Sequence, residues 1–136
     1  MKPWLRTLLI VVAVVVVLYG AFSAFAMYSN GTEVNVRVHV GKDAQGMYMR
    51  CDAANSTPGV CDDARQMTVR VHARDRVHMT VTDDDGGGHG HDFNVEGWQY
   101  FAWPNSPETE LEAKTESVTF TTWARGTFHV LCELPN

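Results

Sequence analysis

The chain has 136 residues and a formal net charge of −5 at pH 7, with 11 Lys and Arg side chains scattered along it. This length allows one globular domain plus a short appendage, and the lack of a basic patch in the sequence argues against a nucleic-acid partner. The three cysteines are an odd number, which in an exported protein predicts one disulfide and one functional thiol.

The first segment of the chain is apolar. Lys2 and Arg6 precede a run from residue 8 to residue 27 that contains no charged side chain. About 20 apolar residues span a bilayer as a helix, and basic residues in front of it keep the N-terminus cytoplasmic. We therefore expect residues 1–28 to be a membrane anchor, with the rest of the chain on the extracytoplasmic side of the cell membrane. The competing interpretation is a signal peptide cleaved after Ala26.

The pattern of residues 33–136 predicts one domain of short strands separated by turns. The clearest strand is 33–40, which alternates strictly between valine and polar residues. Further strands are expected at 47–51, 67–73, 77–82, 91–96, 99–103, 116–123 and 127–132, with a polar hinge at 29–32, a turn at 41–46 and a polar connection at 104–114. This pattern predicts an all-β sandwich of seven to eight strands after one N-terminal transmembrane helix.

Cys51 and Cys61 flank a loop rich in Gly, Pro, Asn and Ser. A bond between them would close a small ring and contribute about 2–3 kcal/mol to stability. Metal binding is the functional alternative for such a pair, but no second cysteine pair accompanies it. A disulfide between Cys51 and Cys61 is the favoured interpretation.

The remaining thiol, Cys132, ends an apolar strand. Phe128, Val130 and Cys132 share one parity and should face the core, whereas Thr127, His129 and Leu131 take the other face. A thiolate at the mouth of a β core suits copper. The alternative for the thiol alone is a small buried hydrophobe, because free cysteine is among the most buried residue types.

His91 is the candidate imidazole partner of Cys132, because it follows a Gly-rich loop and opens another expected strand. Phe93 and Val95 share its parity and should pack inward beside it. His89 is the rival ligand, two residues away. An imidazole and a thiolate that meet at one end of a sandwich form part of a trigonal His₂Cys copper site.

Three segments resemble the cupredoxin family of small type 1 blue-copper proteins. They are Arg74-Asp-Arg-Val-His-Met-Thr-Val81, His91-Asp-Phe-Asn-Val95 and Gly126-Thr-Phe-His-Val-Leu-Cys-Glu-Leu-Pro135. The resemblance extends from about residue 33 to the end of the sequence. It implies a Greek-key sandwich in which His91 and Cys132 are copper ligands.

In that family a short turn after the cysteine leads to a second His and then to a weak axial ligand, usually Met. Here the turn 133–136 ends the printed sequence, so we expect the second His at the position after Asn136 and the chain to stop just before its site is complete. The binuclear copper domain of cytochrome oxidase subunit II is a near relative. It needs a second cysteine where Asn136 stands, so a mononuclear site is the better interpretation.

The resemblance implies a membrane-anchored type 1 copper protein that carries single electrons between redox protein partners, such as respiratory-chain donors and acceptors, and is not an enzyme. The alternatives are a copper-binding or copper-delivery module, and a metal-free cupredoxin-like assembly domain. A domain of a larger oxidase or nitrite reductase is the weakest alternative, because the sequence offers no second metal site for catalysis.

Overall fold

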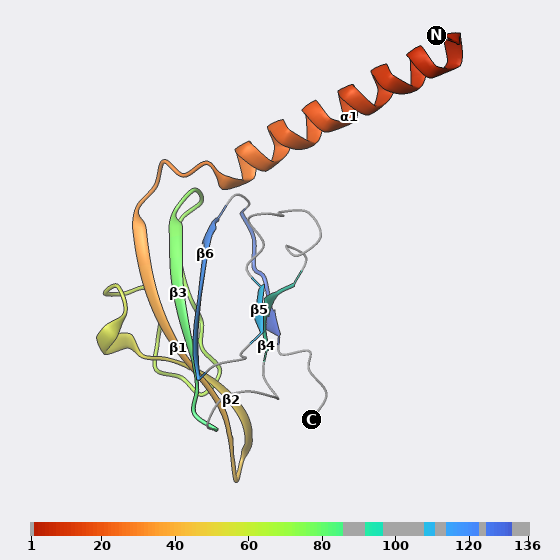
Figure 1. Cartoon of the computed structure of the whole chain (residues 1–136). Coiled ribbons are helices and arrows are strands. Elements are labelled where there is room, and N and C mark those ends of the chain that lie inside the picture. Colours follow the sequence, from red (N-terminus) through yellow and green to blue (C-terminus); the bar gives the residue numbers. More distant parts are fainter. Residues whose placement is uncertain (1, 86–91, 97–107, 111–113, 123–124, 132–136) are drawn as a thin grey trace.

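The computed structural model describes residues 2–85, 92–96, 108–110, 114–122 and 125–131. Within these ranges one N-terminal helix, α1, is followed by mostly β structure (Figure 1). The elements in chain order are α1 (Pro3–Met27), β1 (Glu33–Asp43), β2 (Gly46–Cys51), the 3₁₀ turn η1 (Ala53–Asn55), β3 (Arg76–Asp83), β4 (Asp92–Val95), β5 (Glu108–Glu110), β6 (Thr115–Thr121) and β7 (Val130–Leu131).

Helix α1 is long and apolar enough to cross a membrane. It has 25 residues with a mean hydropathy of 2.8 in its most apolar stretch, and Ala26 is its one buried residue. At about 1.5 Å per residue it exceeds the roughly 30 Å of a bilayer's hydrocarbon core. A signal sequence near an N-terminus has the same length and composition. Figure 1 shows α1 leaving one end of the β domain.

The larger sheet has four strands in the order β2-β1-β3-β6. It is mixed, because β1 runs parallel to β3 while β1–β2 and β3–β6 are antiparallel. The alternation predicted for β1 is confirmed: its four valines are buried and face the same side as the apolar residues of β3. Together these residues form the centre of the core: Val34, Val36, Val38, Val40, Val77, Met79 and Val81.

A second sheet has three short antiparallel strands in the order β5-β4-β7. Phe93 and Val95 of β4 belong to the same hydrophobic cluster as the valines of the larger sheet, and Phe120 of β6 joins them. The chain after α1 is thus mostly β, as expected. The Greek-key arrangement of seven to eight strands stays a prediction.

Some strand limits differ from those expected. Residues 67–72 alternate in exposure but form no ladder: the one bridge within the expected strand at 67–73 joins Val69 to Cys61, and a second, between Gln66 and Met49, lies just before it. The backbone of the segment bonds in turn to β2 and to the loop at 60–61. A strand, β5, lies inside the connection expected at 104–114. The turn expected at 41–46 is shorter, because β1 and β2 both extend into it. The strand expected at 99–103 lies outside the described residues.

Candidate functional site

The two predicted copper ligands, His91 and Cys132, and the rival His89, lie outside the described residues. The strands next to them in sequence are described. Asp92, directly after His91, opens β4, and Leu131, directly before Cys132, closes β7. The two strands are antiparallel, with Val95 opposite Val130 and Asn94 opposite Leu131. The start of β4 and the end of β7 therefore lie at the same end of the second sheet.

Strand β4 is covered on both of its faces. Phe93, Asn94 and Val95 are 0%, 2% and 6% exposed, although alternate residues of a strand point to opposite sides. Within the described part of the chain, the Oδ1 atom of Asn94 has no hydrogen-bond partner. A buried acceptor without a donor is costly in free energy. Asn94 is thus an unsatisfied polar side chain between the buried apolar residues Phe93 and Val95.

The residues before Cys132 face the sides that the sequence predicted. Phe128 and Val130 are half-buried and pack against the core, whereas Thr127 and His129 are exposed. The ladder is shorter than expected, since only Val130 and Leu131 are in β7. The local parity of the thiol-bearing segment is confirmed as far as residue 130.

Cys51 and Cys61 lie at disulfide-bonding distance. Their Cα atoms are 6.1 Å apart, within the usual range for a bridge. Cys51 ends β2 and is buried, and Cys61 is half-buried against the core. The pair thus joins the end of β2 to the loop that returns toward residue 69.

No three His, Cys, Asp or Glu side chains gather into a possible metal-binding group among the residues that the structure describes. The donor types of His91 and Cys132, an imidazole and a thiolate, are those of a type 1 copper site. These two donors fit copper chemically, and a trigonal site needs one more. A copper site built on His91 and Cys132 stays a prediction from the sequence.

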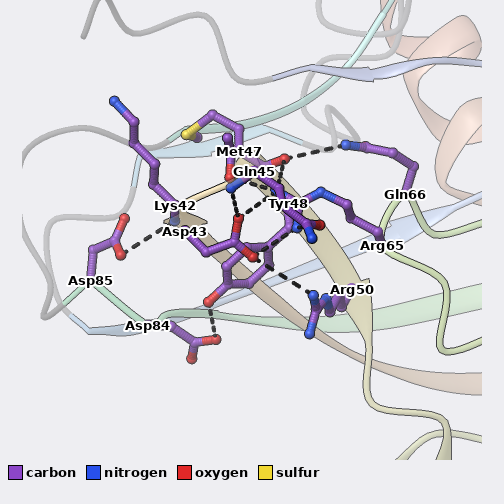
Figure 2. A network of polar contacts seen from close by, with 11 residues as sticks. Lys42, Asp43, Gln45, Met47, Tyr48, Arg50, Arg65, Gln66, Asp84 and Asp85 are labelled. Carbon is purple, nitrogen blue, oxygen red and sulfur yellow. Dashed lines mark hydrogen bonds and ion pairs between the residues drawn. The ribbon is translucent and has the colours of Figure 1, made fainter.

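A polar network at the β1–β2 hairpin has no counterpart among the sequence predictions (Figure 2). The Arg65 guanidinium donates to both carboxylate oxygens of Asp43, at 2.7 and 2.8 Å, and to the Gly46 carbonyl at 2.7 Å. The hydrogen bonds from Arg65 lower the pKa of Asp43 from 3.8 to about 2. The clamp holds the loop at 65–66 against the hairpin.

The same network reaches the acidic residues that follow β3. The Tyr48 hydroxyl donates to Asp84 Oδ2 at 2.8 Å, which raises the pKa of Tyr48, and the ring lies on Gly41. His39 Nδ1 lies 2.9 Å from Asp84 Oδ1. Asp85 accepts from the backbone N–H of Lys42 at 3.3 Å. These contacts are structural: they fasten the end of β3 to the hairpin. Sequence reasoning missed them because no local pattern links residues so far apart in the chain.

Comparisons with known proteins do not assign the chain to a family. No protein-family model, no curated protein and no solved structure matches it.

Proposed function

We propose that this chain is a membrane-anchored, extracytoplasmic type 1 copper protein that carries single electrons between redox protein partners, with His91 and Cys132 among its ligands. The observation that carries the proposal is the pairing of β4 with β7. In sequence, His91 directly precedes the first of these strands and Cys132 directly follows the second, and the described strand ends next to them lie at the same end of the sheet. An imidazole and a thiolate that leave neighbouring strand ends are donors suited to a trigonal copper centre.

A Greek-key β-sandwich is the fold that we propose for the domain at 33–136. Two observations support it. The strands divide into a four-stranded and a three-stranded sheet, and inward residues of both sheets belong to one hydrophobic cluster. Phe93 and Val95 of the second sheet pack in the same core as the valines of the first sheet. A sandwich of this kind holds side chains at its ends nearly fixed, because both sheets are packed on a common core.

The anchor is the second part of the proposal. Lys2 and Arg6 at the start of α1 favour a cytoplasmic N-terminus, which places the β domain on the extracytoplasmic side. Retention of α1 is supported by its length, because its 25 residues exceed the apolar core of about 7–15 residues that a signal peptide has.

Fast electron exchange requires copper-binding side chains that barely move between the two oxidation states. When bound, copper would supply a one-electron Cu(I)/Cu(II) couple. The chain's part is to fix the donor next to β4, where Phe93, Asn94 and Val95 are at most 6% exposed. A strand packed on both faces is hard to displace, so the reorganisation that opposes electron exchange is small. The buried Oδ1 of Asn94 offers an acceptor near this end of the sheet.

Copper loading tests the proposal. We would append one His after Asn136, where the resemblance expects the second imidazole, and titrate the full chain with Cu(II). The expected result is one copper per chain with an intense visible charge-transfer band. Replacing His91 with Gln should weaken or shift that band, while the matched variant His72→Gln, at a side chain that is 95% exposed, should leave it unchanged. Copper that transfers quickly to a chelator would instead indicate a delivery module. No retained copper would indicate a metal-free assembly domain.

A further inference from the structure

The linker between α1 and β1 is fastened to the turn that precedes β3. The Gly31 N–H and the Ser29 hydroxyl both donate to the Arg74 carbonyl, at 3.0 and 2.7 Å, and the Thr32 N–H donates to Asp75 Oδ1 at 2.8 Å. A Cβ on Gly31 would lie 2.8 Å from the Asp75 backbone nitrogen, so the approach needs glycine. The segment that the sequence predicted to be a polar hinge is therefore a tight joint.

The side chain of Arg74 completes the joint from the other side. Its Nη1 donates to the Phe25 carbonyl at 2.7 Å, and its guanidinium carbon lies 3.9 Å from the centre of the Phe25 ring. The last carbonyls of a helix lack intrahelical partners and carry partial negative charge, and α1 has no basic residue in its last turn. Arg74 supplies that cation from a distant part of the chain. The Thr121 hydroxyl adds a bond of 3.0 Å to the Met27 carbonyl.

The backbone of Arg74 is held in an uncommon conformation. Its φ of 73° is left-handed, which few residues other than glycine adopt. Its N–H donates to the Thr122 carbonyl at 2.6 Å, and Asp75 Oδ2 accepts from the His72 N–H at 2.7 Å. The turn is thus fixed by the end of β6 and by a buried carboxylate. As a result, the end of α1 and this end of the larger sheet form one unit.

Among the described residues at this end of the domain, arginines outnumber exposed acids. The acid of the turn, Asp75, is only 3% exposed and is bonded to two N–H groups, whereas the side chain of Glu33, which pairs with His78, is 61% exposed. The arginines of the turn and of the neighbouring strand ends are Arg70, Arg74, Arg76 and Arg125, of which Arg70 and Arg125 are exposed. The opposite end of the sheet carries the acids Asp43, Asp84 and Asp85.

We propose that the helix-proximal end of the domain is a docking surface for phospholipid headgroups, so that the domain lies on the bilayer in one orientation. The proposal rests on α1 spanning the membrane. The joint keeps the turn at the point where α1 leaves the bilayer, which brings these arginines to the level of the lipid phosphates. Guanidinium groups bind phosphate oxygens with paired hydrogen bonds. Phe25 and Tyr28, both more than half exposed, are aromatic side chains of the kind found at membrane interfaces.

Hydrogen–deuterium exchange of the full chain tests the docking surface, with copper omitted throughout. The chain would be placed in nanodiscs of phosphatidylcholine and phosphatidylglycerol and, separately, in maltoside micelles, which carry no phosphate. We expect the amides of residues 70–76 and 125–127 to exchange more slowly in the nanodiscs. In the double variant Arg70→Ala/Arg125→Ala this difference should disappear. The exchange rate of these amides in nanodiscs should rise by about fivefold for each arginine removed. The matched control Arg37→Ala/Arg50→Ala removes two exposed arginines that lie elsewhere on the domain and should behave like the parent chain.

The variant Gly31→Ala tests the joint between α1 and the turn before β3 independently of lipid docking. It should speed exchange at residues 29–32 in nanodiscs and in micelles alike, while Gly20→Ala, where an added Cβ meets nothing within 4 Å, should not. Equal exchange of the 70–76 amides in the two environments would overturn the proposal, as would a double arginine variant that matches the parent chain in nanodiscs. A chain that does not remain in the nanodisc fraction would overturn docking and anchoring together. None of these outcomes depends on the copper site.

Discussion

Asp75→Asn is a sharp test of the turn that joins helix and sheet. Asp75 is 3% exposed, and its two carboxylate oxygens accept from the N–H groups of Thr32 and His72, at 2.8 and 2.7 Å. Asparagine has the same shape, but it keeps one acceptor and turns an NH₂ group toward the other N–H. One hydrogen bond to a charged group, worth about 1.5–3 kcal/mol, is lost, and a donor is left facing a donor. We expect the free energy of unfolding to fall by roughly 2–4 kcal/mol.

The assay is chemical denaturation of the full chain in detergent, followed by near-ultraviolet circular dichroism, which reports the packed β domain. For a domain of this size the expected loss lowers the thermal midpoint by roughly 10–20 °C. Asp62→Asn is the matched control, because Asp62 is exposed and accepts one long bond of 3.3 Å from Thr68. It should change stability by less than about 0.5 kcal/mol. A similarly small effect of Asp75→Asn would refute the view that this carboxylate organises the turn.

Further expected outcomes concern the hairpin, the cysteines and the helix. The pKa of Asp43 is lowered to about 2, so the contribution of its clamp with Arg65 is present above pH 4 and lost as pH falls through about 2. Carboxyl-carbon NMR titration should give that midpoint, and Arg65→Met should return it toward 3.8; a midpoint near 3.8 in the parent chain would contradict the clamp. Non-reducing peptide mapping should link Cys51 to Cys61, and a link from either to another cysteine would contradict the pairing. N-terminal sequencing of the membrane fraction should begin at the start of the chain, and a start at Met27 would show cleavage.

The sequence predicts the features of this fold that depend on local alternation. The valines of β1 and the parity of Phe128 and Val130 follow from the two-residue period of a strand, and the structure places them as expected. Local alternation cannot say which strands pair. Residues 67–72 alternate in exposure yet form no ladder, because their backbone bonds are divided between β2 and the loop at 60–61. The three residues of β5 are polar and give no signal of a strand.

The long-range polar contacts could not be predicted for a different reason. Arg74 caps α1, and Arg65 clamps Asp43, across tens of residues of sequence. Each contact needs the folded topology before its partners meet, and an arginine in a turn has the same appearance in sequence whether it is solvated or bonded. The motifs around His91 and Cys132 are the opposite case. Their sequence pattern predicts a function, which stays a prediction; the structure describes only the strands beside them, β4 and β7, which pair with each other.

The visible spectrum of the copper-loaded chain, extended by one His after Asn136, tests the central claim most directly when it is recorded for the parent and for Cys132→Ser. A thiolate bound to Cu(II) gives the intense charge-transfer band of a type 1 site, and serine cannot replace it. We predict a strong band in the parent and none in Cys132→Ser, with Cys51 and Cys61 unchanged in both. A colourless parent, or a band that survives the loss of Cys132, would contradict the electron-carrier account.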